Sequence, residues 1–134
     1  MENSLQLLRA TSVVPMLYLP NLAAGIEFYK AAFGAVVHWS VDHEGRVHVA
    51  ELSIANAVFR MHEEYSKNSG RTPASLGGTT VVLNLIVTDP DAVAASAVAA
   101  GAKEVSPVQD YDYGYRQGTV IDPFGHHWQL EKGI

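Results

Sequence analysis

The feature that most constrains the fold is an order of predicted elements that occurs twice along the chain. In the first half, an apolar run from Val13 to Leu19 precedes a helical segment ending at Gly34, and three short strand-like runs follow. The same order returns in the second half, where the helical segment ends at Gly101. The two glycines are 101 − 34 = 67 positions apart, half of the 134 residues. A repeated strand-helix-strand-strand-strand unit predicts two related modules, about residues 11–64 and 79–134 of one domain.

Both predicted helices have clear start and stop signals. Asn21 and Asp89 can cap their first turns, and Pro90 follows Asp89 at the first helical position. Gly34 and Gly101 are placed where a glycine commonly ends a helix. The apolar positions at helical spacing are Leu22, Ile26, Tyr29 and Phe33 in the first helix, and Val93, Ala97 and Ala100 in the second.

The remaining apolar runs predict strands separated by turn residues. We expect turns at residues 42–45, 55–56 and 122–125, and Gly45 can adopt a positive φ. Residues 63–78 are polar and predict a mobile connection, with Gly77 and Gly78 as a hinge. The predicted strands are Val13–Leu19, Ala35–Val41, Arg46–Ser53, Ala57–His62, Thr80–Val87, Lys103–Gln109, Tyr115–Ile121 and Trp128–Lys132.

The fold class expected from this order is α+β, with two βαβββ modules whose curved mixed sheets form a cleft. Each sheet covers one face with its own helix, and strand alternation predicts which side chains point the other way. Ala57, Phe59 and Met61 should pack on the first helix. The side chains expected on the concave side are Val14, Met16, Tyr18, Val58, Arg60 and His62 in the first module, and Val82, Asn84, Ile86, His127, Gln129 and Glu131 in the second.

Composition excludes several classes of function. Hydrophobic residues make up 48% of the chain, which is enough for a core, and the net charge of -5 comes without any basic run, so we expect no nucleic-acid partner. The absence of cysteine removes disulfides and thiolate chemistry. We find no signal-peptide pattern in residues 1–10 and no apolar run near the roughly 20 residues that span a bilayer. We therefore expect a cytoplasmic protein that does not enter membranes.

Three segments resemble the vicinal-oxygen-chelate superfamily, which includes glyoxalases, bleomycin-resistance proteins and dioxygenases. They are Ile26–Ala35 (IEFYKAAFGA), Gly45–Leu52 (GRVHVAEL) and Asp122–Leu130 (DPFGHHWQL), and the second of them points to the PhnB-like branch. The resemblance covers about Val13 to Lys132 and is specific for the fold. It is poorly specific for function, because the superfamily contains enzymes and pure drug binders. It also implies a homodimer, because relatives commonly build each cleft from two chains.

The resemblance also implies where a metal ion would be held in relatives of glyoxalase I. The ligand positions in the first and fourth strand of each module fall on Val14, Arg60, Val82 and Gln129. Valine offers no lone pair, and arginine keeps its positive charge, which repels a cation. Gln129 alone is a weak ligand, so we expect no metal and no other cofactor.

Arg60 is the strongest candidate for ligand binding. Its fork of donors suits a carboxylate or phosphate group on a ligand. The alternative is a structural ion pair with Glu131 or with a dimer partner.

Two histidines give a second candidate. His62 and His127 could act as general acid or base, or could form a displaced metal site together with Glu131. The alternative is that they are ordinary histidines at strand ends.

Aromatic residues supply the remaining ligand-binding candidates. Trp39 could stack on a planar ligand, or could belong to the core or to a dimer interface. Tyr111, Tyr113 and Tyr115 could form a wall over the cleft, or could pack on a neighbouring subunit. Arg116 is expected to pair with Asp110 or Asp112. The predicted ligand-binding set is Trp39, Arg60, His62, Asn84, Tyr113, Tyr115, His127 and Gln129.

No local motif for a nucleophile or for phosphate binding occurs, so catalytic residues stay unknown. The hypothesis with most support is a metal-independent protein that binds a small, antibiotic-like molecule. The alternative is a lyase, isomerase or dioxygenase-like enzyme with a rearranged or absent metal site. A pure interaction module is a third class, and the sequence does not identify a ligand for any of the three.

Overall fold

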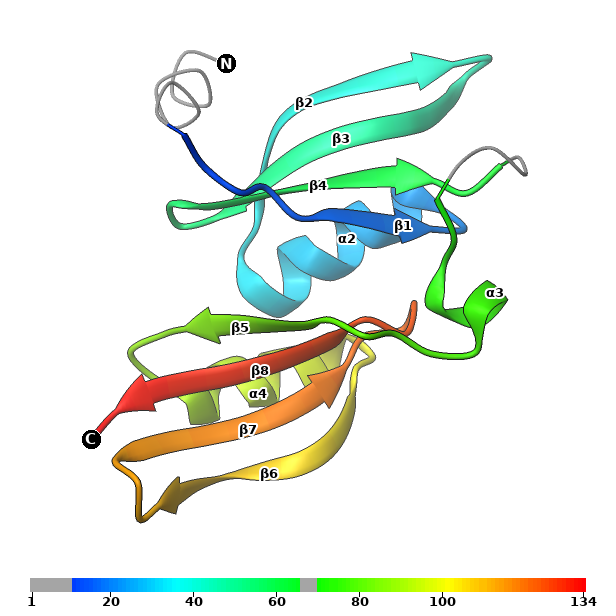
Figure 1. The fold of residues 1–134 in the computed structure, drawn as a ribbon. Coiled ribbons are helices and arrows are strands. Elements are labelled where there is room, and N and C mark those ends of the chain that lie inside the picture. Colours follow the sequence, from blue (N-terminus) through cyan, green and yellow to red (C-terminus); the bar gives the residue numbers. More distant parts are fainter. Residues whose placement is uncertain (1–10, 66–69) are drawn as a thin grey trace. The chain divides into compact units, whose positions relative to one another are not determined.

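The computed structural model describes residues 11–65 and 70–134 and contains the predicted strand-helix order twice (Figure 1). The described residues form two compact units, one comprising residues up to Lys30 and Gly34–Thr72, the other Ala31–Phe33 and Pro73–Ile134. The first unit contains β1 (Met16–Leu19), most of α2 (Leu22–Phe33), β2 (Val36–His43), β3 (Arg46–Ile54) and β4 (Ala57–Glu63). The second contains α3 (Pro73–Leu76), β5 (Val82–Ile86), α4 (Pro90–Ala100), β6 (Lys103–Tyr111), β7 (Tyr115–Ile121) and β8 (His127–Gly133). No described helix is long and apolar enough to span a membrane.

Each unit has one mixed four-stranded sheet, so the expected α+β class with two βαβββ modules is confirmed. The strand orders are β1-β4-β3-β2 and β5-β8-β7-β6. In both sheets the first strand runs parallel to the last strand, and the other pairs are antiparallel. The parallel pairing requires a crossover, and the helix that follows the first strand supplies it.

The predicted helix ends are confirmed. The side chains of Asn21 and Asp89 each accept a hydrogen bond of 3.1 Å from the backbone N–H three residues later. Gly34 ends α2 with a φ of 69° and Gly101 ends α4 with a φ of 123°, conformations that residues with a Cβ rarely adopt.

The turn between β2 and β3 is shorter than expected. Both strands extend toward it, and only Glu44 and Gly45 remain between them, with φ values of 53° and 78°. Two consecutive positive φ values are typical of the tightest hairpin connection. The predicted positive φ of Gly45 is therefore confirmed, whereas the four-residue turn is wrong.

The first core lies between α2 and the strands β1 and β4. Phe59 and Met61 are buried, and the ring of Phe59 meets that of Tyr29 edge-on at a centroid distance of 5.3 Å. Gly25 lets the helix approach closely, since a Cβ there would lie 2.4 Å from Cδ2 of Leu19. The alternation predicted for β4 is therefore confirmed, except that Ala57, at the start of the strand, is exposed.

The second core lies beneath α4, which packs against β6, β7 and β8. The buried face of α4 is formed by Pro90, Ala94 and Ala97, so the predicted face of Val93, Ala97 and Ala100 is correct only at Ala97. The error arises because alanine fills most positions of this helix, which leaves little hydrophobic contrast to mark a face. Trp128 and Leu130 are buried from the sheet side, as the alternation in the last strand predicts.

The connection between the modules contains a short helix that the sequence reasoning missed. Pro73 begins α3, and the N–H groups of Gly77 and Gly78 both donate to its carbonyl oxygen. Gly77 therefore ends a helix instead of acting as part of a plain hinge. Residues 66–69 of the predicted connection, and residues 1–10, lie outside the described residues.

Candidate functional site

The helix-free face of each sheet, meaning the face opposite its own helix, contains the predicted ligand-binding residues. In the first sheet, the register pairs Met16 with Arg60 and Tyr18 with His62 on β4. Arg60 in turn pairs with Glu51, and Glu51 pairs with Trp39 on β2. Directly paired residues project from the same side of a sheet, so these side chains share one face.

Arg60 forms an ion pair with the most buried carboxylate on that face. Its Nε donates to Oε1 of Glu51 over 3.0 Å, and Glu51 is fully buried. The guanidinium also lies over the ring of Trp39, with 5.5 Å between its central carbon and the ring centroid. The expected ion pair of Arg60 therefore exists, and its partner within the first unit is Glu51. Alternation along β3 was the signal that could have identified Glu51.

Arg60 keeps further binding capacity. Its side chain is 35% exposed, and among the described residues only its Nε has a partner. The two terminal nitrogens can donate to another anionic group, and a planar group could extend over the neighbouring indole ring of Trp39.

His62 lies in a cluster of aromatic rings near the end of the first sheet. Its ring centroid is 5.1 Å from that of Tyr18, 4.7 Å from that of His48 and 5.9 Å from that of Tyr65. His62 Nδ1 also shares a hydrogen bond with the carbonyl of Glu63. The sequence reasoning missed Tyr18, His48 and Tyr65 as neighbours of His62, because His48 is on another strand and Tyr65 follows β4.

A cavity of about 420 Å³ adjoins this cluster and is lined in part by His43, His48 and Tyr65. Arg46 closes one part of its wall through an ion pair of 2.9 Å with Glu63, which is almost fully buried. The first unit thus offers a hollow with imidazole and phenol rings beside its helix-free face.

In the second sheet, Glu131 organises the helix-free face. Its Oε1 accepts hydrogen bonds from the side-chain amides of Gln117, over 2.7 Å, and Gln129, over 3.1 Å. Its Oε2 accepts one from Asn84 over 3.3 Å. Because the amide nitrogens of Asn84 and Gln129 face the carboxylate, their carbonyl oxygens are left to accept hydrogen bonds from other groups.

The three tyrosines at the tip of β6 and β7 lie together, as their spacing predicts. The rings of Tyr111 and Tyr113 are stacked at 5.3 Å, and Tyr115 follows at 6.2 Å from Tyr113. The hydroxyl of Tyr113 donates to Oε1 of Gln117, which connects the tyrosines to Glu131. Desolvation, and then electrostatic interactions with Tyr111 and Glu131, raise the pKa of Tyr113, which favours the protonated hydroxyl that donates to Gln117. Gln117 was missed, although alternation from Tyr115 could have placed it on this face.

Arg116 has one predicted and one unexpected partner. It donates to Asp110 over 2.9 Å, as expected, and to Asp91 in the first turn of α4 over 2.7 and 2.8 Å. Its predicted alternative partner, Asp112, has no such contact with it among the described residues. Arg116 therefore ties α4 to the hairpin of β6 and β7.

The residues at the implied metal-ligand positions do not fit a metal ion. Val14 and Val82 offer no donor atom, and Arg60 presents a cation that is already paired with Glu51. The nitrogen of the Gln129 amide is committed to Glu131. Throughout residues 11–65 and 70–134, no three His, Asp or Glu side chains are grouped in a way that could hold a metal ion.

The displaced metal site of His62, His127 and Glu131 is opposed by the geometry of the second unit, where His127 and Glu131 lie too far apart to share an ion. His127 and Glu131 project from the same face of β8 but are four residues apart. At about 3.3 Å per strand residue their Cα atoms are roughly 13 Å apart, which is too far for both side chains to bind one ion. His127 instead pairs with Val82 and Ile121 in the register and does not join the network around Glu131.

The structure thus brings most of the predicted site residues into two groups. Trp39, Arg60 and His62 lie on the helix-free face of the first sheet, and the others lie on that of the second or at its tip. The expected cleft shared by the two sheets stays a prediction, because each unit is described by itself.

Comparison with known proteins places this fold in a broad group. The model of the Glyoxalase/Bleomycin resistance protein/Dioxygenase superfamily matches residues 11–130. Uncharacterized protein Mb0911c of Mycobacterium bovis is 40% identical over 124 residues, which span 90% of this chain and 82% of that protein. Uncharacterized protein At5g48480 of Arabidopsis thaliana is 33% identical over 112 residues, which span 77% of this chain and 66% of that protein.

Solved structures agree with this assignment. The X-ray structure of the Arabidopsis thaliana At5g48480 product has a TM-score of 0.73 at 30% identity, covering 92% of this chain and 99% of that one. TioX from Micromonospora sp. ML1 has a TM-score of 0.75 at 23% identity, covering 93% and 100%. The fosfomycin resistance protein FosX from Listeria monocytogenes, complexed with Mn(II) and sulfate, has a TM-score of 0.68 at 16% identity, covering 93% and 91%. The last two similarities concern the fold alone.

Proposed function

Because the chain belongs to the glyoxalase/bleomycin resistance protein/dioxygenase superfamily, we propose that it is a small-molecule-binding protein that works without a metal ion. The PhnB-like branch, the cytoplasmic location and the homodimer are part of the same proposal. The observation that carries it is the pairing of Arg60 with Glu51 at a position where metal-dependent relatives are expected to hold a ligand. A fixed cation there favours an anionic group on the ligand and opposes a divalent ion.

The side chains on the two helix-free faces indicate which chemical groups of a ligand each face could bind. The terminal nitrogens of Arg60 suit a carboxylate, and the ring of Trp39 suits a planar body. We therefore propose that the first face binds a planar, carboxylate-bearing molecule, a class that includes antibiotic-like compounds. The carbonyl oxygens of Asn84 and Gln129 on the second face suit hydroxyl or amine donors.

The test uses 2-naphthoate as the simplest planar carboxylate, followed by a panel of planar antibiotics. Binding to the folded state raises the unfolding free energy by RT ln(1 + [L]/Kd), which is about 2.7 kcal/mol at a hundredfold excess over Kd. A thermal-shift series should therefore show a rise in Tm that saturates with 2-naphthoate concentration. The rise should be unchanged after treatment with a chelator.

A double variant separates binding from folding. Arg60→Ala alone would leave the buried Glu51 without its ion pair, so a loss of binding could reflect lost stability. In Glu51→Gln with Arg60→Met, both charges are removed together, and we expect nearly unchanged stability with 2-naphthoate binding lost. Glu63→Gln with Arg46→Met is the matched control, because it removes in the same way both charges of another ion pair with a nearly buried carboxylate. Full 2-naphthoate binding by the double variant would contradict the proposal.

The alternative is an enzyme of the lyase, isomerase or dioxygenase type with a rearranged or absent metal site. Added Mn²⁺ or Zn²⁺ distinguishes the two functions in an isothermal titration. A binder that needs no metal should give no stoichiometric heat with either ion. Stoichiometric binding of an ion, abolished by Glu131→Gln, would favour the enzyme and overturn the first proposal.

A further inference from the structure

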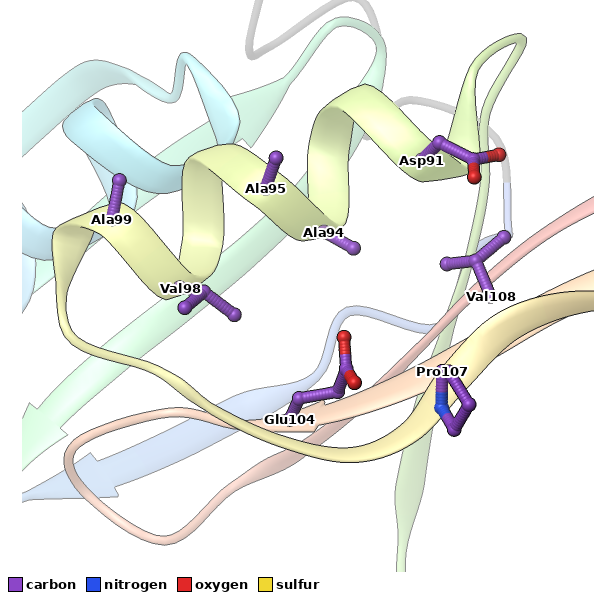
Figure 2. Close-up of a pocket in the computed structure, with 8 residues that line it drawn as sticks. All are labelled: Asp91, Ala94, Ala95, Val98, Ala99, Glu104, Pro107 and Val108. Carbon is purple, nitrogen blue, oxygen red and sulfur yellow. The ribbon is translucent and has the colours of Figure 1, made fainter.

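A second cavity lies on the opposite side of the second sheet, between α4 and β6, and has a volume of about 540 Å³ (Figure 2). Four small side chains of α4, Ala94, Ala95, Val98 and Ala99, form one wall. Pro107 and Val108 of β6 contribute to the other wall. The volume is within the range of about 300–1,000 Å³ that is usual for small-molecule sites. This cavity is separate from the helix-free faces on which the proposed function depends.

The cavity has a clear origin in the sequence of the second module. The first helix, α2, buries the aromatic side chains of Phe28 and Tyr29 against its surroundings. After Asp91, α4 contains only alanine, valine and serine, so no large side chain fills the equivalent space. The small side chains of α4 therefore leave the hollow beside β6 open.

The shape of β6 adds to the hollow. The pairing of β6 with β7 shifts register twice between Glu104 and Gln109, which bends the strand. Val108 lies close to Gly118 of β7, where a Cβ would come within 2.8 Å of the backbone nitrogen of Val108. The bend thus depends on a glycine that leaves room for the strand.

One carboxylate of the cavity is available to a ligand. Glu104 pairs with Val120 in the register, and Val120 is buried on the side of the sheet that α4 covers. Figure 2 shows the carboxylate of Glu104 directed into the space between strand and helix. In the described part of the chain, no hydrogen bond or ion pair to this carboxylate is found.

The other charged groups near the cavity compensate one another only in part. Asp91 is bound by Arg116 through two contacts, and Asp110 is bound by the same guanidinium. Lys132 also acts on Asp91 at longer range, so Glu104 is the carboxylate of the cavity lining that has no ion pair among the described residues. The remaining negative charge favours a positively charged ligand.

We propose that this cavity binds a small organic cation with a short apolar chain. The ammonium group donates to the carboxylate of Glu104, and the chain lies against Ala94, Val98 and Val108. Both parts are needed, because an ion pair at a partly exposed site contributes little by itself.

The probe is n-hexylammonium, compared with hexanoate and hexan-1-ol, which have the same chain length but a negative charge or none. Amide chemical shifts of the full-length protein should change for residues 94–99, 104–106 and 108 with hexylammonium and should saturate. Glu104→Gln should weaken this binding about twofold to fivefold, the range for an exposed charge pair. Glu27→Gln, which changes an exposed glutamate on α2, is the matched control and should bind as the unchanged protein does.

A filling variant tests the cavity itself. Val98→Phe enlarges a side chain that points from α4 toward β6 (Figure 2), so it should fill the cavity and abolish the saturable shifts. Equal binding of hexylammonium and hexanoate, or unchanged affinity in Glu104→Gln, would overturn the proposal. A cavity that takes a side chain of a second copy instead would give a dimer that Val98→Phe dissociates, and this outcome would also overturn it.

Discussion

At the scale of single residues, two buried glutamates decide the chemistry of the helix-free faces. Glu51 holds the guanidinium of Arg60, and Glu131 holds the amides of Asn84, Gln117 and Gln129. A buried carboxylate needs several donors to remain charged, and here the donors are the side chains that can also meet a ligand. Glu51 and Glu131 therefore hold these side chains in defined orientations and reduce their mobility.

Gly118 is a residue where one methyl group should have a large effect. Gly118→Ala would bring a Cβ within 2.7–2.9 Å of side-chain and backbone atoms of Val108, and a strand backbone cannot easily move away. We expect a loss of about 1–3 kcal/mol in the free energy of unfolding, as for other overpacked sites. Urea unfolding followed by circular dichroism measures this loss.

Gly133→Ala is a suitable control for Gly118→Ala, because a Cβ at Gly133 meets nothing within 4 Å. Its effect on the free energy of unfolding should be small. If the two variants were equally stable, the close approach of Val108 to Gly118 would be refuted.

At the scale of elements, the second module depends on a charged link where the first has aromatic packing. Arg116 of β7 binds Asp91 in the first turn of α4 and Asp110 of β6. These hydrogen bonds to the two carboxylates raise the pKa of Arg116, which stays protonated at all accessible pH values. The link between helix and hairpin therefore varies with pH only through its carboxylates.

Because of the ion pair between Arg116 and Asp91, we expect the protein to lose stability in acid. The hydrogen bond from Arg116 lowers the pKa of Asp91 below its usual value. The ion pair of Asp91 with Arg116 therefore contributes its full stabilisation above about pH 3.9, the pKa of aspartate in the unfolded chain. This stabilisation is lost as the pH falls through the lower pKa of Asp91 in the folded protein. Asp91→Asn should destabilise the protein at about pH 7, and the difference from the unchanged protein should shrink toward about pH 3.

Thermal unfolding at several pH values measures this difference. Asp112→Asn serves as the control, because Asp112 is close in sequence to Asp110 but forms no ion pair with Arg116 in the described structure. A difference between Asp91→Asn and the unchanged protein that stayed constant with pH would show that Asp91 acts through something other than its charge.

At the scale of the whole molecule, each unit covers one face of its sheet with a helix and leaves apolar side chains exposed on the other. Met16 and Val36 are 41% and 60% exposed in the first sheet, and Val82 and Ile86 are 52% and 72% exposed in the second. Exposed apolar groups that share a face with polar anchors are typical of surfaces that bind a ligand or another chain.

We propose on this basis that two copies of the chain associate. Light scattering coupled to size exclusion should give a mass of twice 14.5 kDa. Val82→Glu together with Ile86→Glu should reduce that mass toward the single value, because charges placed in an apolar interface oppose association. A mass of 14.5 kDa for the unchanged protein over a wide range of concentrations would refute the dimer.

The sequence alone determined most of the helices and strands and the faces of the strands. Cap residues such as Asn21 and Asp89 and end glycines such as Gly34 act locally, so their effect can be predicted without a structure. Strand alternation likewise separated Phe59 and Met61 from Arg60 and His62. The short helix α3 was missed because its signals lie within a polar segment of mixed composition.

Only the tertiary structure decided which side chains meet. The pairing of Arg60 with Glu51, of Arg116 with Asp91, and of Glu131 with three amides joins residues from different strands or helices. Their contacts follow from strand register and from the way α4 packs on its sheet. Register arises from interactions between segments distant in sequence, and periodicity within one segment contains no information about it.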